Sequence, residues 1–516
     1  MYDPSPLRAQ WSPTYCAWSS HSVPVYFKPG TLAANGFNVT NFREAFADAL
    51  AVWNEESGAN VDLYYAGETT ASVPTPGRII VSHGDDGSCA DPLLAVTSLP
   101  GSGDCSGGGV FIQMILKDPC THAVRPWVTT WPGSTAGGGF IYEGSLIHEL
   151  GHALGLPDVT TQHGVMHGWA LEAGAGLHLY TDDGLTVQQQ MGLTTRNPAT
   201  ISSTNATSFG APSLLASYFS SQGPTVTAAS DGVSPFRIGV WDQIWQLAGA
   251  SSGNHGSWTG MTSPPNGYIG SIHDPVSISR SNSDNEVILA WPSDCHTETH
   301  CDIRWALTSN GGSSWSTGTI SGAGAIGRVE VAYDAFRNRF VLAYINGDSA
   351  RIYTASAIAQ NPLSWSVPQV ASQTVGGFAQ AFRYMGGVVF DSSGLGLLTA
   401  GAFDTTGRPG VIVQMAVTYP LATRYSVGAW SYANSTLPLN YVTRRPFGLA
   451  RSSGGTIALA WRGGSSTRAF TTAIKASMSP TSAFGAGGER ASSVINSVDI
   501  AWSPVSNTFL GAFSWP

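Results

Sequence analysis

The chain has 516 residues, of which 11% are charged, and its formal net charge is −9. This length favours two or more domains, each large enough to bury a core. The acidic balance, without any cluster of lysine and arginine, excludes a nucleic-acid surface, and no apolar run reaches the ~18 residues that a membrane span needs. The low charge and abundant glycine predict a folded, strand-rich protein, which we expect to be a monomer.

The first part of the chain, residues 1–193, predicts an α/β domain. Its clearest element is a helix in which Phe42, Phe46 and Trp53 recur at helical spacing, with Asn41 and Glu44 as a capping box. Short apolar runs between turn residues predict strands. The predicted strands cover residues 23–27, 61–65, 78–82 and 110–116, and the predicted helices cover residues 42–53, 145–155 and 181–191.

The second part, residues 223–516, repeats one pattern of an apolar strand, a polar turn and a second strand ending in a small residue and an aromatic. The copies lie about 50 to 60 residues apart, a period typical of propeller blades, and predict six blades after a linker over residues 194–222. They end at Val240-Trp241, Ala290-Trp291, Tyr344, Thr399-Ala400, Ala460-Trp461 and Phe513. A pair of β-sandwiches is the alternative.

The cysteines divide evenly between the two parts. Four lie in the first part and two in the second, which favours disulfides within each part and an oxidising compartment. We therefore expect a secreted protein, although Met1 is not followed by a leader sequence. The pairing expected in the second part joins Cys295 to Cys301. Six reduced, buried thiols are the alternative.

Residues 148–152 read His-Glu-Leu-Gly-His and predict a metal site. Two imidazoles one helical turn apart, His148 and His152, can bind one Zn²⁺. Gly155 lets the chain leave the helix sharply, so that Asp158 becomes the third ligand. Glu149 lies beside the open coordination position, where it would act as the general base. Two competing third ligands follow in the sequence, His163 and His167.

These residues together resemble the extended zinc signature of the metzincin peptidases, in the snapalysin-like form that has aspartate as third ligand. Residues 164–168 resemble the family's Met-turn, with Met166 beneath the metal. The resemblance covers about residues 20–193 and implies a twisted mixed sheet with three helices, one catalytic zinc ion and endopeptidase activity. The loop around His83 resembles a matrixin structural-metal loop but lacks further histidines, so a disulfide between Cys89 and Cys105 is expected to replace a second zinc.

The function that follows is a secreted zinc metalloendopeptidase acting on a protein or peptide substrate. The substrate would pair with a strand at the sheet edge, through Val110, Phe111 and Ile112. The propeller would be an accessory domain that binds a glycan or protein ligand. The alternative is a propeller-based adhesin or carbohydrate-binding protein with a non-catalytic zinc domain.

Two further motifs resemble sialidase-like propellers. Residues 308–315 resemble an Asp-box turn with Asn310 in place of the usual aspartate, and residues 236–239 resemble the arginine-bearing strand motif. A sialidase would need three arginines to converge on one carboxylate, for which Arg237, Arg280 and Arg383 are the candidates. The sequence alone does not show whether they do.

Overall fold

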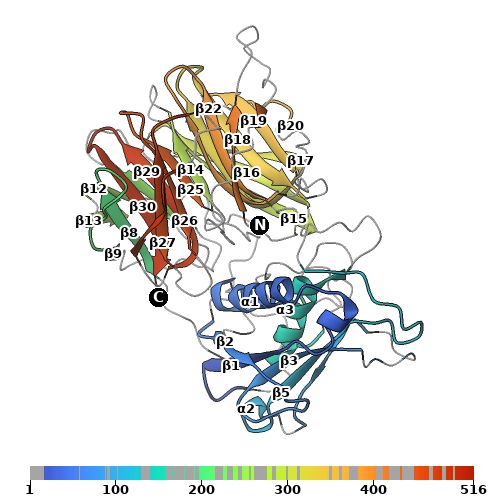
Figure 1. Ribbon diagram of the computed structural model, residues 1–516. Coiled ribbons are helices and arrows are strands. Elements are labelled where there is room, and N and C mark those ends of the chain that lie inside the picture. Colours follow the sequence, from blue (N-terminus) through green and yellow to red (C-terminus); the bar gives the residue numbers. More distant parts are fainter. Residues whose placement is uncertain are drawn as a thin grey trace. The chain divides into compact units, whose positions relative to one another are not determined.

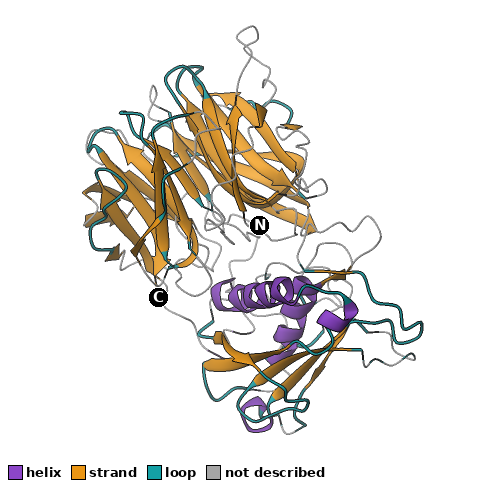
Figure 2. Cartoon of the chain, in the orientation of Figure 1, coloured by secondary structure: helices purple, strands orange, loops and turns teal. Residues whose placement is uncertain are grey.

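A computed structural model shows two compact units, residues 1–195 and 196–516 (Figure 1). Each unit is described by itself. The helices among the described residues belong to the first unit, whereas the second is built of strands (Figure 2). No helix in the described part of the chain is long and apolar enough to cross a membrane. The structure describes residues 17–56, 59–85, 87, 89, 93–101, 103–129, 140–158, 165–166, 179, 187, 191, 197–214, 225–228, 236–241, 247–254, 257–260, 276–281, 286–297, 300–310, 314–347, 351–359, 363–370, 382–402, 411–417, 431–432, 447–463, 469–478, 484–491 and 494–515.

The first unit is a five-stranded mixed sheet in the order β2-β1-β3-β5-β4. Four strands run parallel, and β4 pairs antiparallel with β5 at one edge. Its elements are β1 (Ser22–Lys28), η1 (Ala33–Asn35), α1 (Val39–Glu56), β2 (Asp62–Glu68), β3 (Ile79–Gly84), β4 (Ala95–Ser98), α2 (Cys105–Gly108), β5 (Val110–Ile115), β6 (Trp127–Val128), β7 (Phe140–Ile141) and α3 (Tyr142–Ala153). The predicted α/β pattern is therefore present. The sequence did not predict β4 of the five-stranded sheet or the short strands β6 and β7.

Helices α1 and α3 pack against each other and against the sheet (Figure 1). Trp53 of α1 is fully buried, and its indole Nε1 donates a hydrogen bond of 2.8 Å to the carbonyl of Ile147 in α3. The capping residue of α1 is Asn38, whose side-chain oxygen accepts from the backbone of Thr40 and Asn41. The predicted capping box at Asn41 is wrong, because the helix begins one turn earlier. Of the predicted third helix, only Val187 and Met191 are described; both are helical and buried.

The second unit is a six-bladed β-propeller. Each blade is a four-stranded antiparallel sheet, and the seven-stranded sheet is two blades that share β17: its first half pairs with β16 and its second half with β18. The first blade consists of β10 (Thr225–Ala228), β11 (Phe236–Trp241), β12 (Leu247–Asn254) and β13 (Ser257–Gly260), and the second of β14 (Ser277–Arg280), β15 (Val287–Thr297), β16 (His300–Thr308) and β17 (Ser316–Asp334). The third blade consists of β17 with β18 (Arg339–Asn346), β19 (Arg351–Ile358) and β20 (Gln369–Val370), and the fourth of β21 (Phe382–Phe390), β22 (Gly396–Ala402), β23 (Val411–Val417) and β24 (Ser431–Tyr432). The fifth blade consists of β25 (Gly448–Arg451), β26 (Ile457–Arg462), β27 (Phe470–Lys475) and β28 (Gly488–Ala491).

The last blade, which we call the closing blade, joins the two ends of the unit. It consists of β29 (Ile495–Ser503) and β30 (Thr508–Trp515) together with β8 (Asn197–Ser203) and β9 (Ser213–Leu214). The innermost strands β10, β14, β17, β21, β25 and β29 each contact the next, and β29 contacts β10, so the ring is closed. The predicted linker over residues 194–222 is therefore wrong in part, because two of its segments are strands of the closing blade.

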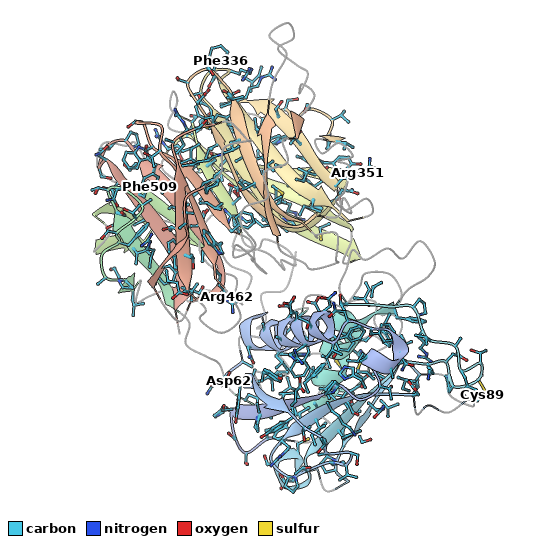
Figure 3. All side chains as sticks on the ribbon, in the orientation of Figure 1. Asp62, Cys89, Phe336, Arg351, Arg462 and Phe509 are labelled. Carbon is cyan, nitrogen blue, oxygen red and sulfur yellow. A yellow bond between two sulfur atoms is a disulfide. The ribbon has the colours of Figure 1, made fainter. Side chains whose placement is uncertain are left out.

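The repeat that the sequence shows is confirmed as the second strand of every blade. The six copies end in β11, β15, β18, β22, β26 and β30. Apolar side chains of these strands fill the space between the sheets, as Phe509 of β30 does (Figure 3). The turn that resembles an Asp-box connects β16 to β17, and the side-chain oxygen of Asn310 accepts from the backbone of Ser314 as an aspartate would.

Candidate metal centre

Helix α3 carries both histidines of the motif. Leu146, Ile147 and Leu150 are fully buried in the core of the first unit, which fixes the rotation of the helix about its axis. His148 and His152 then lie one turn apart, with ring centroids separated by 4.7 Å. The helix ends where predicted: Gly155 has a φ of 91°, which favours glycine, and its N–H bonds to the carbonyl of His152.

Backbone carbonyls orient both imidazole rings. Nδ1 of His148 donates to the carbonyl of Val165 over 2.8 Å, and Nδ1 of His152 donates to that of Leu156 over 2.8 Å. With Nδ1 of each ring donating to a carbonyl, Nε2 is the nitrogen that faces Asp158 and can bind a metal ion after losing any proton. Such second bonds hold metal-binding histidines in position in known sites.

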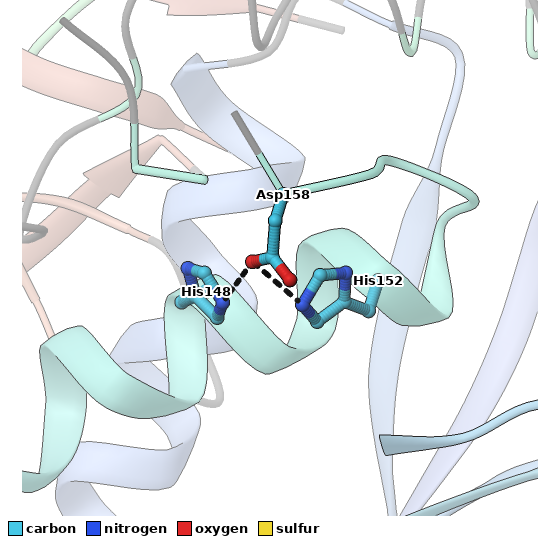
Figure 4. Close-up of side chains that lie close together, drawn as sticks. All are labelled: His148, His152 and Asp158. Atoms are coloured by element: carbon cyan, nitrogen blue, oxygen red, sulfur yellow. Dashed lines mark ion pairs between the residues drawn. The ribbon is translucent and has the colours of Figure 1, made fainter. Parts of the chain in front are cut away.

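Asp158 brings its carboxylate to the same two atoms. Its Oδ1 lies 3.2 Å from Nε2 of His148 and 3.4 Å from Nε2 of His152, and Figure 4 shows the three side chains converging. A tetrahedral zinc with ligands at about 2.0–2.1 Å would place neighbouring ligand atoms about 3.3 Å apart. The spacing and the donor set, two imidazole nitrogens and one carboxylate oxygen, therefore fit zinc. Among the described residues, this is the group identified as able to hold a metal ion.

The close approach of the three side chains shifts the pKa values of Asp158 and His148. Hydrogen bonds from His148 and His152 lower the pKa of Asp158. Burial lowers the pKa of His148, but the hydrogen bond to Asp158, the charge of Glu149 and the Val165 carbonyl offset it, so the net pKa is raised. A metal ion must displace the proton from Nε2 in order to bind.

Glu149 lies between the two histidines in the sequence, and its side chain is buried. Its carboxylate is not part of the group of three metal ligands. The hydroxyl of Thr97 donates to Glu149 Oε2 over 2.5 Å. Thr97 belongs to β4, so the edge strand of the sheet fixes the carboxylate. The sequence carried no signal for this contact, because β4 was not predicted.

Met166 packs against helix α3 at Gly151. It is fully buried, and a Cβ added to Gly151 would lie 2.2 Å from its Sδ and 3.0 Å from Trp53. Glycine between the two histidines therefore allows the close approach of Met166. Its neighbour Val165 supplies the carbonyl that orients His148. The competing ligands His163 and His167 lie outside the described residues.

The predicted substrate strand is not at the edge of the sheet. Val110, Phe111 and Ile112 belong to β5, which pairs with β3 on one side and β4 on the other. Their backbone groups are occupied, so the predicted pairing with an extended peptide at this strand is wrong. The sequence placed β5 at the edge because β4 was read as part of a loop.

The loop beside the sheet is closed by a different disulfide from the one expected. Cys89 bonds to Cys120, not to Cys105 (Figure 3), and Cys105 is disulfide-bonded elsewhere. His83 is a structural residue: Nδ1 donates to the Lys28 carbonyl, Nε2 accepts from the Tyr142 hydroxyl, and burial lowers its pKa to about 4. In the second unit Cys301 is disulfide-bonded, and its pairing with Cys295 stays a prediction.

Of the three arginines expected of a sialidase, one has a described side chain. Arg280 is buried in β14. Arg237 lies in β11 and Arg383 in β21, and the side chains of both are outside the described ones. Their convergence on one carboxylate stays untested.

Comparisons with known proteins find likenesses in structure alone. Neither the protein-family models nor the curated proteins contain a match. Among solved structures, the chain is similar to a Hadza microbial sialidase at 11% identity and a TM-score of 0.39, over 57% of this chain and 66% of that one. It is also similar to the six-bladed lectin of Aleuria aurantia, described with a fucose recognition mode, at 11% identity and a TM-score of 0.34, over 54% and 84%. An α-L-arabinofuranosidase from Fusarium graminearum matches at 10% identity and a TM-score of 0.40, over 57% and 92%.

These matches contradict the prediction of a zinc metalloendopeptidase, since the proteins found are glycosidases, a lectin and a polysaccharide lyase. The comparisons do not show the metzincin resemblance, and they give no support to a protein or peptide substrate. The physical reason is that residues 148–152 specify two imidazoles on a helix, and such a motif does not specify which bond is broken.

Proposed function

We propose that the chain is a carbohydrate-binding β-propeller protein whose first unit binds one zinc ion. The single observation that carries the metal part is the spacing of the three ligand atoms. Asp158 Oδ1 lies 3.2 and 3.4 Å from the two Nε2 atoms, close to the edge of a zinc tetrahedron. His148, His152 and Asp158 would hold the ion.

The donor set selects among metals. Imidazole suits zinc, copper, iron and nickel, whereas magnesium and calcium prefer oxygen ligands alone. Three protein ligands leave a fourth position for water, whose pKa a bound zinc ion lowers. In this chain, the carbonyls of Val165 and Leu156 orient the imidazoles, and Thr97 holds Glu149. We propose Glu149 as the residue placed to accept a proton there.

The metal content of purified protein tests the site. We expect about one zinc per wild-type chain and loss of most of it in His148→Ala and Asp158→Asn. Glu149→Gln is the matched control: it changes a buried carboxylate beside the ligands and should keep its zinc. Equal zinc in wild type and in both ligand variants would disprove the site.

The propeller supplies the ligand-binding part of the proposal. Its fold is supported by six four-stranded blades, two of which share β17, and by contacts between their innermost strands that close the ring. The ligand class is taken by analogy from what the matched lectin and sialidase are described as doing, so carbohydrate is the class to test first. The disulfide Cys89–Cys120 supports secretion, because disulfides persist in oxidising compartments.

A glycan array probed with the full-length protein, with and without a metal chelator, tests this second part. Binding to a defined set of glycans that survives chelation would support a propeller ligand that does not need the metal. Binding lost on chelation would assign recognition to the first unit. An array without any bound glycan would remove carbohydrate from the proposal and leave the zinc site standing.

A further inference from the structure

A cluster of charged side chains is buried on the innermost strands of the propeller. Arg328 and Glu330 lie on β17, and Asp499 lies on β29 of the closing blade. The three side chains are 1%, 11% and 7% exposed. With Ser277 of β14 they form what we call the axial cluster. Burial of this degree argues against a site for a substrate and points to a role inside the fold.

One nitrogen of the guanidinium serves both carboxylates. Nη2 of Arg328 lies 2.9 Å from Oε2 of Glu330 and 3.2 Å from Oδ1 of Asp499. Arg328 therefore connects the third blade to the closing blade. Ser277 adds the second blade: its hydroxyl donates to Glu330 Oε2 over 3.1 Å and accepts from the backbone N–H of Val331 over 3.0 Å.

The charges in the axial cluster do not balance. One guanidinium faces two carboxylates, and its Nε and Nη1 have no hydrogen-bond partner among the described residues. Among the described side chains, the charged groups that act on Glu330 are Arg328 from its own strand and Asp499 from β29, whereas β14 adds the uncharged Ser277. Burial raises the pKa of Glu330 to about 7; the charge of Arg328 acts against the rise and that of Asp499 adds to it.

We propose that the axial cluster is a proton-operated clasp, in which protonation of Glu330 leaves Arg328 paired with Asp499 alone and tightens the closing blade onto the ring. With Glu330 ionised, two carboxylates share one nitrogen and repel each other in a medium of low dielectric. With Glu330 protonated, Asp499 no longer shares Nη2 of Arg328 with a second carboxylate, which strengthens the bond between the third blade and the closing blade.

The direction of the pH effect follows from linkage. The unfolded chain loses the Glu330 proton near its ordinary value of 4.5, whereas the folded chain loses it near 7. The folded state therefore binds the proton more tightly between these values, and its stability falls as pH rises through this window. The contribution of this one residue is on the order of a hundred-fold in the folding equilibrium constant.

Urea unfolding of full-length wild type and Glu330→Gln at pH 5 and pH 8 tests the clasp. Other titrating groups are common to both proteins, so the difference between them isolates Glu330. Relative to wild type, we expect the variant to gain on the order of a hundred-fold in the folding constant on going from pH 5 to pH 8. Glu489→Gln, which removes an exposed carboxylate on β28, should follow wild type at both pH values.

Parallel profiles for wild type and Glu330→Gln would overturn the proposal. If Glu330→Gln does not fold, Asp499→Asn decides, because it removes the second negative charge and leaves Glu330 as the sole partner of Arg328. Its stability should depend less on pH than that of wild type. A dependence equal to that of wild type would overturn the proposal as well.

Discussion

Each unit contains a polar cluster, and the two clusters are built in opposite ways. In the first unit, His148 and His152 each donate a hydrogen bond from Nδ1 to a backbone carbonyl, and Nε2 of each ring faces Asp158. In the second, Arg328 lies between Glu330 and Asp499. The first cluster thus presents acceptor atoms to an external cation, whereas the second contains its own.

This difference separates a ligand site from a structural one. Burial differs between the clusters, since the side chain of Asp158 is 65% exposed and that of Asp499 is 7% exposed. A second distinguishing feature is whether the cluster already contains a cation between its acceptor atoms. Where acceptor atoms converge on one point, a cation can bind among them; where a guanidinium already lies between the acceptors, the cluster stabilises the fold or responds to protons.

The largest effect that tests this contrast is expected from Arg328→Met. It removes the internal cation and leaves two buried carboxylates facing each other, which should destabilise the propeller by about 3–5 kcal/mol at pH 8. Urea unfolding measures the loss. Arg351→Met, at the start of β19, removes a partly exposed arginine as the control. A loss no greater than that of the control would show that the axial cluster does not depend on its guanidinium.

A smaller effect is expected from Gly151→Ala in the first unit. The new methyl group would lie 2.2 Å from Met166 Sδ and 3.0 Å from Trp53, and overpacking of this kind costs about 1–3 kcal/mol. Thermal unfolding with and without zinc measures it. In a Met166→Ala background the same substitution should cost little, because the clash is gone. An equal cost in both backgrounds would remove Met166 as the cause.

The smallest effect is expected from Ser277→Ala. It removes the hydroxyl that bonds both Glu330 and the backbone N–H of Val331, and leaving that buried N–H unpaired costs about 1–2 kcal/mol. Urea unfolding at pH 5 and pH 8 measures the loss. Because Ser277 is uncharged, the slope of stability against pH should change less than in Glu330→Gln. A change as large as in that variant would assign the proton to a wider network.

The sequence predicts elements that repeat or follow one period. The propeller was visible because the second strand of each blade ends in a small residue and an aromatic, and the helix α3 because Leu146, Leu150 and Leu154 share one face. The metal ligands were visible for the same reason, since His148 and His152 stand one turn apart. Repeats, apolar helix faces and paired ligands of this kind can be predicted because they depend only on the spacing of residues close together in the sequence.

Contacts between distant segments were not predictable in this way. The carbonyls of Val165 and Leu156 carry no side-chain signal, and β4 is a four-residue strand within a loop-like stretch. Its absence from the prediction put β5 at the sheet edge. The part that β8 and β9 play in the closing blade was missed because β8 pairs with the opposite end of the chain, and no period in the sequence reports such a pairing.

The closing blade has a consequence for synthesis of the protein. Ser203 of β8 pairs with Phe509 of β30, so the ribosome must add about 300 further residues before β8 finds its partner, or roughly 15–60 s at ordinary rates. Throughout that time, the strand that carries the buried residues Ala199 and Ile201 lacks its β30 partner and presents an unpaired edge. Cells that make this protein would benefit from a chaperone during that interval, and slow translation would lengthen the exposure.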